Sequence, residues 1–166
     1  MFRLLVSSIL AFLLAFHSYN HDVLARSLTI EDCITLLNDK VQQDIISSFP
    51  FLKNLKKNDS ALTFSYEELI KMRIPLGEEE THLNSLISLF HGTSIGNRHL
   101  LIINDKYSEK WQNSFTGYLF YKELNGTNIL LTIKRGPQKW EVVKRSKVWG
   151  RYITFEHISK DCVRNH

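Results

Sequence analysis

The sequence predicts an α+β fold in which N-terminal helices pack on a C-terminal antiparallel sheet of four to five strands. Between residues 29 and 90, apolar residues recur at three- and four-residue spacing, which is the period of a helix buried on one side. From residue 100 onward the chain is rich in aromatic residues and in apolar–polar alternation, and Asn125-Gly126 is a strong hairpin signal. The apolar face of such a sheet must be buried from water, and we expect the N-terminal helices to pack on it.

The first predicted helix begins at Thr29, which caps it together with Asp32 three residues later. It ends after Phe49, because Pro50 cannot continue a helix. We expect its apolar stripe to face the core, and the stripe contains Ile30, Cys33, Ile34, Leu37, Val41 and Ile45.

Two further helices are predicted. Residues 51–63 are rich in Lys and Asn and are expected to form a loop, and residues 66–73 a short helix or turn capped by Ser65. Residues 77–90 form the third helix, whose first turn carries an acidic triplet at 78–80 that suits the helix dipole. Its buried face is predicted to contain Leu83, Leu86, Ile87 and Phe90.

The remaining chain alternates between strands and turns. We expect strands at 100–103, 115–124, 129–133, 139–149 and 151–157, with turns at 125–126 and 135–138 and a bend at Gly150. In the strand 139–149 we expect Trp140, Val142 and Val148 to lie on one side. This order of elements resembles the cone-like, helix-on-curved-sheet folds of the nuclear-transport-factor-2-like and cystatin-like kinds, and such a resemblance implies a fold and no function.

The first twenty-five residues have the pattern of a secretory signal peptide. A basic start at Arg3 is followed by an uncharged apolar run over 4–16, and the small residue Ala25 ends the segment. The run is shorter than the roughly 20 apolar residues that span a bilayer. We therefore predict cleavage after Ala25 and a secreted or periplasmic protein, with residues 26–166 forming one α+β domain.

Two cysteines, Cys33 and Cys162, remain after that cleavage. Cysteines in an exported chain usually pair, because the compartment is oxidising. We predict a disulfide between the first helix and the C-terminal tail. Asn58-Asp59-Ser60 and Asn125-Gly126-Thr127 match the acceptor pattern for N-glycosylation, which is relevant only in a eukaryotic host.

Catalytic and cofactor motifs are weak in this chain. Neither a nucleotide-binding glycine loop nor a Gly-x-Ser-x-Gly elbow is present, so we expect no nucleotide or other cofactor. Glu78 and His82 share a helix face, but an HExxH pattern is absent, so we expect His82 to be exposed and no metal to bind. The other histidines that bear on a metal or catalytic site are His91, His99 and His157.

A run of basic residues near the C-terminus is the most distinctive functional signal. Within it Glu141 is the one acidic residue, and Trp140, Trp149 and Tyr152 are interleaved with the cations. The run favours binding of an anionic partner such as an acidic protein, a lipid headgroup or an acidic glycan, and nucleic acid is a less suitable partner for an exported chain. The predicted binding residues are Lys134, Arg135, Lys139, Lys144, Arg145, Lys147 and Arg151.

Three interpretations remain open at this level. The leading one is a non-enzymatic binding protein of the inhibitor or immunity type that uses a basic sheet face. The alternative is a small secreted hydrolase or ligand-pocket protein, with His82, His91 or His99 in a cleft. The plainest interpretation is structural: lysines on an edge strand prevent aggregation, and the tryptophans fill the core.

Overall fold

A computed structural model of the chain describes residues 28–56, 61–72, 78–105, 114–158 and Cys162. The predicted signal segment 1–25 and Asn58 lie outside these residues. The helices are α2 (Ile30–Ser48), α3 (Phe51–Leu55), α4 (Tyr66–Lys71) and α5 (Glu78–Leu89), and a 3₁₀ turn η1 spans Phe155–His157. The strands are β1 (Ala61–Phe64), β2 (Ile95–Asp105), β3 (Ser114–Lys122), β4 (Thr127–Arg135) and β5 (Trp140–Trp149).

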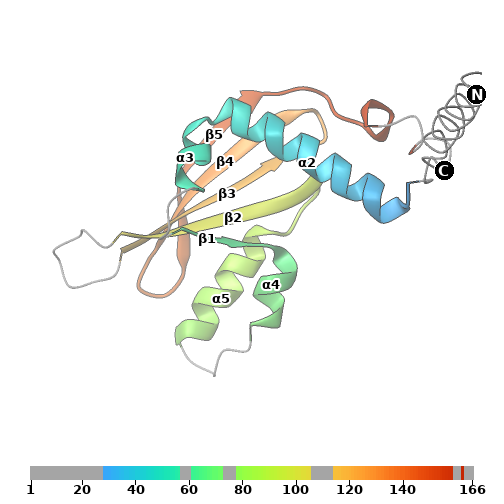
Figure 1. Cartoon of the computed structure of the whole chain (residues 1–166). Coiled ribbons are helices and arrows are strands. Elements are labelled where there is room, and N and C mark those ends of the chain that lie inside the picture. Colours follow the sequence, from blue (N-terminus) through green and yellow to red (C-terminus); the bar gives the residue numbers. More distant parts are fainter. Residues whose placement is uncertain (1–27, 57–60, 73–77, 106–113, 159–161, 163–166) are drawn as a thin grey trace, which may run out of the picture.

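The strands form one open, five-stranded antiparallel sheet in the order β1-β2-β3-β4-β5 (Figure 1). Each strand therefore pairs with its neighbour in the chain, and β1 and β5 are the two edges. Helix α2 precedes the whole sheet, whereas α4 and α5 lie between β1 and β2 in the chain. The predicted α+β arrangement of N-terminal helices and a C-terminal antiparallel sheet is confirmed.

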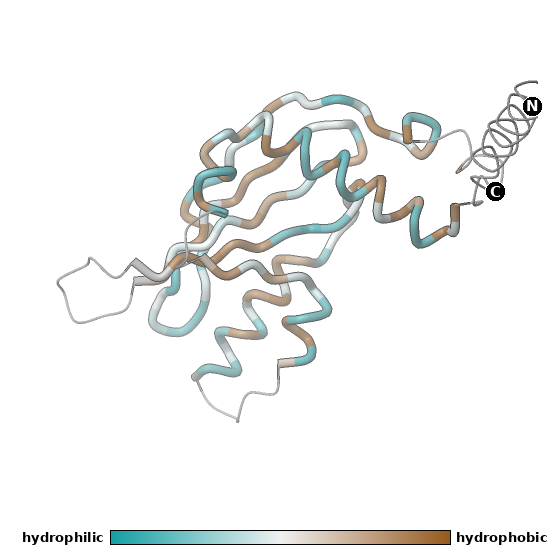
Figure 2. Tube along the Cα trace, viewed as in Figure 1, coloured by the Kyte–Doolittle hydropathy of each residue, from teal (hydrophilic) through white to brown (hydrophobic). Residues whose placement is uncertain are grey.

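Helices cover both faces of the sheet, where one covered face was expected. Neighbouring strand residues point to opposite sides, and here both sides are apolar: Leu130 packs with α2 and α3, whereas Leu131 packs with α5. Leu100 and Leu101 divide in the same way. Figure 2 shows the consequence: the central strands carry long apolar stretches, while α2 alternates between apolar and polar turns. Strands that are apolar on both sides need two covers.

Helix α2 begins with the predicted capping box. The Asp32 amide donates to the Thr29 hydroxyl at 3.1 Å, and the Thr29 amide donates to the Asp32 carboxylate at 2.9 Å. The buried stripe advances in steps of four residues through Cys33, Leu37, Val41 and Ile45. Ile30 and Ile34 were expected on it but are exposed, because the first turns of α2 extend past the strands (Figure 1).

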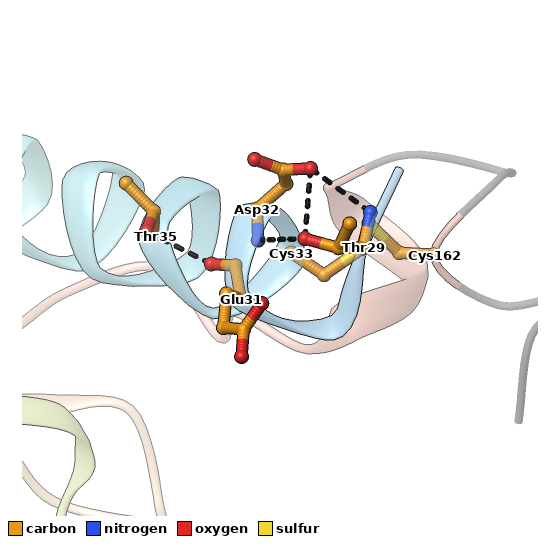
Figure 3. The surroundings of a disulfide bond; sticks show 6 residues. All are labelled: Thr29, Glu31, Asp32, Cys33, Thr35 and Cys162. Carbon is orange, nitrogen blue, oxygen red and sulfur yellow. Dashed lines mark hydrogen bonds between the residues drawn. A yellow bond between two sulfur atoms is a disulfide. The ribbon is translucent and has the colours of Figure 1, made fainter. Parts of the chain in front are cut away.

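The disulfide between Cys33 and Cys162 is confirmed. Figure 3 shows it beside the capping box at the start of α2, and the two Cα atoms lie 5.8 Å apart. The bond joins residues 129 positions apart, so it ties the first helix to the end of the chain.

Two segments differ from their predictions. Residues 51–63 contain α3 and the edge strand β1, where a loop was expected, and β1 is recognisable only through its pairing with β2. Residues 151–157 form no strand. After Gly150 the chain leaves the sheet edge and runs over the α2 side, where Ile153 joins the core beside Leu37 and Val41.

The hairpin between β3 and β4 is confirmed, but its turn has a different geometry from the predicted one. The Gly126 amide donates to the Glu123 carbonyl at 2.9 Å, and the Glu123 amide donates to the Thr127 carbonyl at 2.8 Å. Residues 124–126 therefore form a three-residue loop. Gly126 has a φ of +91°, which is the left-handed conformation that closes such loops.

Candidate functional site

The predicted basic residues lie on β4, on β5 and on the segments beside them, but they do not share one face. In an antiparallel pair, directly opposed residues point to the same side. Arg145 and Lys147 oppose Leu131 and Ile129, whose side chains pack on the α5 side. Lys144 opposes Thr132 and points to the α2 side.

The other predicted cations divide in the same way. Arg135 opposes the buried Trp140 on the α5 side, whereas Lys134 opposes Glu141 on the α2 side. Lys139 lies in the turn before β5, and Arg151 follows β5 on the α2 side. Because strand residues alternate, a basic run that is continuous in sequence is split between two surfaces.

Two of these cations are already paired. The Arg145 guanidinium donates to Glu123 at 3.0 Å, and Arg135 pairs with Glu79. In the part of the chain that the structure describes, the side chains of five others form no ion pair. These five are Lys134, Lys139, Lys144, Lys147 and Arg151.

The aromatic residues of the basic run differ sharply in exposure. Trp140 is buried, at 8% exposure, and its ring lies against the α5-side core, as the structural interpretation predicts. Trp149 is 77% exposed and opposes Thr127, so it points to the same side as Arg145 and Lys147. The structural interpretation thus holds for Trp140 and fails for Trp149. We call Arg145, Lys147 and Trp149 the β5 surface.

Trp140, Val142 and Val148 were expected on one side of the strand. Val142 opposes Ile133 and shares the α5 side with Trp140. Val148 opposes Asn128 on the α2 side, and both valines are exposed, at 47% and 38%. A register shift between Thr132 and Ile133 interrupts the pairing of β4 with β5 at this point. Because β5 is also an edge strand, its far side has no neighbour. A bulge and several lysines on an edge strand are features that discourage edge-to-edge pairing of sheets.

A buried polar cluster at the end of the sheet was not foreseen from the sequence. Lys122, fully buried on β3, donates to the carboxylate of Asp44 on α2 at 2.7 Å. It also donates to the carbonyls of Gly126 and Arg151, at 2.9 and 3.0 Å. Asn128 donates to the same Asp44 oxygen at 2.7 Å and to Ser48 at 2.8 Å. The sequence signal that could have indicated this cluster is the presence of a lysine and an asparagine, Lys122 and Asn128, at the ends of two otherwise apolar strands that pair with each other.

The charge of Asp44 is stabilised in this cluster. Burial alone would raise its pKa, but hydrogen bonds from Lys122 and Asn128 and the charge of Lys122 hold the pKa below the ordinary 3.8. Gly150 lies directly over the cluster: a Cβ there would come within 2.6 Å of Lys122 Nζ, and closer still to Asp44 and Asn128. The cluster therefore requires glycine at this position.

Two cavities flank the sheet. The smaller, about 200 Å³, lies between α4, α5 and the sheet and is mostly apolar, with Glu79, His82 and Arg135 among its lining residues. The larger, about 400 Å³, lies between α2 and the segment that follows β5. Polar and apolar atoms contribute about equally to its surface, and its lining residues are Lys40, Gln43, Asp44, Ser47, Arg151, Tyr152, Ile153 and His157.

The histidines proposed for a catalytic cleft do not converge. His82 was expected to be exposed, but it is buried, and its Nε2 donates to the Gly136 carbonyl at 2.9 Å on the α5 side. His99 opposes Phe120 on the α2 side and stacks on its ring. Burial, and then the charge of Lys56, lower the pKa of His99 below 6.5. His91 lies exposed just beyond α5.

Neither a metal cluster nor a membrane helix is found in the described ranges. Among those residues, His, Cys, Asp and Glu side chains form no group of three that could hold a metal ion. The helices described there are all too short or too polar to cross a bilayer. Asn125 of the second glycosylation pattern is exposed in the hairpin loop, where its side-chain oxygen accepts from the Thr127 amide at 2.9 Å.

Comparison of the chain with protein-family models, with curated proteins and with solved structures gives no match. The functional argument therefore rests on the geometry of its own residues.

Proposed function

We propose that this chain is an exported, non-enzymatic binding protein whose β5 surface engages an anionic partner. The observation that carries the proposal is the exposure of Trp149 beside two cations on one side of an edge strand. Trp and Arg are enriched in protein interfaces, whereas a single exposed Trp on a solvent-facing strand contributes nothing to the core. The pairing of Arg145 with Glu123 leaves Lys147 as the unpaired cation of this surface.

Export is the second part of the proposal. Its support is the signal-like pattern of residues 1–25 together with a disulfide that joins α2 to the C-terminal tail. Such disulfides persist in oxidising compartments. Intact-mass analysis of the protein recovered outside the cytoplasm should give a chain that starts at Arg26. A mass that includes residues 1–25 contradicts this part alone.

The alternative of a secreted hydrolase has weaker support. His82 and His99 lie on opposite sides of the sheet, and His82 already donates to a main-chain carbonyl. An arrangement of nucleophile, base and orienting group requires mutual contact. The geometry thus favours a binding role.

The test compares two charge-matched variants with the wild type. Arg145→Gln/Lys147→Gln removes two cations from the β5 surface, and Lys53→Gln/Lys71→Gln removes two exposed cations from α3 and α4. Retention on acidic protein, acidic glycan and anionic lipid supports is measured at low and high salt. We expect salt-sensitive retention for the wild type, because attraction between exposed charges is screened over about 8–10 Å. The first variant and Trp149→Ala should lose retention, and the control pair should keep it.

Two results contradict the proposal. One is wild-type retention that is absent or independent of salt. The other is equal loss in both double variants, which would assign the effect to net charge alone. A third pair, Lys134→Gln/Lys144→Gln, removes cations from the α2 side and should have the smaller effect.

A further inference from the structure

The larger cavity, which we call the α2 cleft, is built from chain segments far apart in sequence. One wall is helix α2, with Lys40, Gln43 and Ser47, and the other is the segment after β5, with Arg151 and Tyr152. Its volume of about 400 Å³ is within the range of sites for small organic ligands.

The charge balance of the cleft favours an anion. Its one carboxylate, Asp44, is neutralised from beneath by Lys122, Asn128 and the Arg151 amide. The Lys40 ammonium donates to the main-chain carbonyl of His157 at 2.6 Å, and a carbonyl does not neutralise its charge. Among the residues that the structure describes, the Arg151 guanidinium forms no ion pair either. The cleft is thus lined by two cations, Lys40 and Arg151, while its carboxylate, Asp44, already accepts hydrogen bonds from other groups.

The neutral groups of the cleft suit a ligand with hydroxyls. His157 Nδ1 accepts from the Thr154 amide at 3.2 Å, so the neutral ring carries its proton on Nε2 and can donate from that atom. Ser47 donates its hydroxyl proton to the Gln43 carbonyl at 2.8 Å, which leaves its oxygen free to accept. Tyr152 is 62% exposed, and its ring offers a flat apolar surface.

The wall that carries Arg151 is held rigidly. The Arg151 amide donates to Asp44, and its carbonyl accepts from Lys122 at 3.0 Å. The main chain of this residue is therefore fixed on both sides by the buried cluster below Gly150. A site whose supporting groups are fixed in advance loses less entropy on binding.

We propose that the α2 cleft binds an acidic saccharide unit, that is, a sugar ring bearing a carboxylate or a sulfate. Arg151 and Lys40 bind the anionic group, Gln43, Ser47 and His157 bind hydroxyls, and Tyr152 packs against the ring. This inference rests only on the general proposal of a binding protein for an anionic partner, and it assigns the partner's chemistry to a site on the α2 side that is separate from the β5 surface. A single acidic side chain of a protein would use the two cations but would leave most of the cleft unfilled.

The experiment titrates the exported protein with four probes by isothermal calorimetry. These probes are glucuronic acid, glucose 6-sulfate, glucose and inorganic sulfate. We expect saturable binding of the two acidic sugars, with glucose and sulfate each binding about ten-fold more weakly or worse, since each lacks half of the recognised chemistry. Arg151→Gln and Lys40→Gln should weaken acidic-sugar binding about ten-fold or more, because each removes a charged hydrogen-bond donor.

Lys53→Gln is the matched control, since it removes an exposed cation from α3 outside the cleft. It should leave the affinity unchanged, and thermal melts should show all three variants folded. Absence of saturable binding by both acidic sugars overturns the proposal. So does sulfate binding as tight as that of the sugars, or a loss in Lys53→Gln equal to that in Arg151→Gln.

These experiments test the proposal for the β5 surface and the proposal for the α2 cleft independently. Salt-sensitive retention that requires Arg145 and Lys147, without binding of either sugar, overturns the cleft and leaves the proposed function standing. Sugar binding that requires Arg151 and Lys40, without any contribution from Lys147 or Trp149, overturns the β5 surface and supports the cleft.

Discussion

The two faces of the sheet are held to their helices by different physical means. On the α5 side an apolar core that contains Leu86, Phe90 and Trp140 packs on the central strands. It is combined with a hydrogen bond from His82 to the Gly136 carbonyl and with the partly exposed Arg135–Glu79 ion pair. On the α2 side an apolar core is combined with a buried ion pair between Lys122 and Asp44 and with a disulfide at the start of the helix.

This difference indicates what each face contributes. Apolar packing is non-directional and an exposed ion pair constrains little, so most of the stabilisation on the α5 side does not require one exact geometry. A buried ion pair with all its donors used stabilises little beyond an apolar pair of the same shape, but it tolerates only one arrangement. We infer that the α2 side fixes where the segment after Gly150 lies, and with it the wall of the α2 cleft.

The largest effect is expected for Lys122→Met. The variant leaves the half-buried Asp44 without its cation and the Gly126 and Arg151 carbonyls without their buried donor, so we expect a loss of about 3–5 kcal/mol in the free energy of unfolding. Urea denaturation measures it. Lys53→Met on α3 is the control and should change stability by about 0.5 kcal/mol or less. A loss below about 1 kcal/mol for Lys122→Met would show that the pair does not hold α2.

Trp140→Ala probes the apolar face. The ring is buried in the apolar cluster that contains Ile133 and Leu86, so its removal should cost about 3–5 kcal/mol, towards the lower end if the cavity collapses. Trp149→Ala is a matched control, because Trp149 is 77% exposed on the same strand. It should be nearly neutral in the same urea experiment, and equal losses for the two variants would be inconsistent with their exposures.

The disulfide should contribute somewhat less. Chain-entropy arguments give about 5 kcal/mol for a loop of 129 residues, and measured values are often smaller, so we expect about 2–4 kcal/mol. Thermal melts of Cys33→Ala/Cys162→Ala measure the loss. Reduction of the wild type should reproduce the shift and should leave the double variant unchanged. A reduced wild type with an unaltered melting temperature would mean that the bond contributes nothing.

The smallest effect concerns pH. Burial, with help from the charge of Lys56, holds the pKa of His99 below 6.5 in the folded state. At pH values between this lowered pKa and 6.5, the ring is neutral in the folded protein and protonated in the unfolded chain. Stability from this group is therefore complete above pH 6.5 and is lost as pH falls towards the lowered pKa. Asp44 has a lowered pKa as well, and its contribution is lost only below 3.8.

His99→Gln should flatten the dependence of unfolding free energy on pH just below 6.5. Urea denaturation at several pH values on both sides of 6.5 makes the comparison. Parallel pH profiles for wild type and His99→Gln would contradict the assignment to His99.

Local signals were the ones that predicted structure correctly. The capping box at Thr29–Asp32 depends on residues three positions apart and forms as expected, and Ser65 caps its helix as expected, with Glu68 completing a second box that was not predicted. The hairpin at Asn125-Gly126 is also local, although its turn has three residues. The strand β1 has no such signal, because four residues become a strand only when β2 lies beside them.

The candidate site was predicted only in part. Lys144, Arg145 and Lys147 lie on a strand as the sequence indicated, whereas Arg151 lies in no strand. The division of the cations between two sides follows from the register of β5 and its irregular pairing opposite Thr132 and Ile133. The exposure of Trp149 and the burial of Trp140 could not be distinguished in sequence, since both lie in one basic run. The α2 cleft was missed because its walls are separated by about a hundred residues.

The α+β class, the ends of the main helices, the hairpin and the pairing of the two cysteines can be predicted from the amino-acid sequence, because each follows from short-range preferences or from there being one partner to choose. The side of the sheet that each helix covers, and the polar groups that come together beneath it, depend on how the elements pack. Lys122, Asp44 and Asn128 belong to three elements, and their attraction exists only once those elements are packed. The position of Arg151 over that cluster, and with it the cleft, is a property of the packed fold.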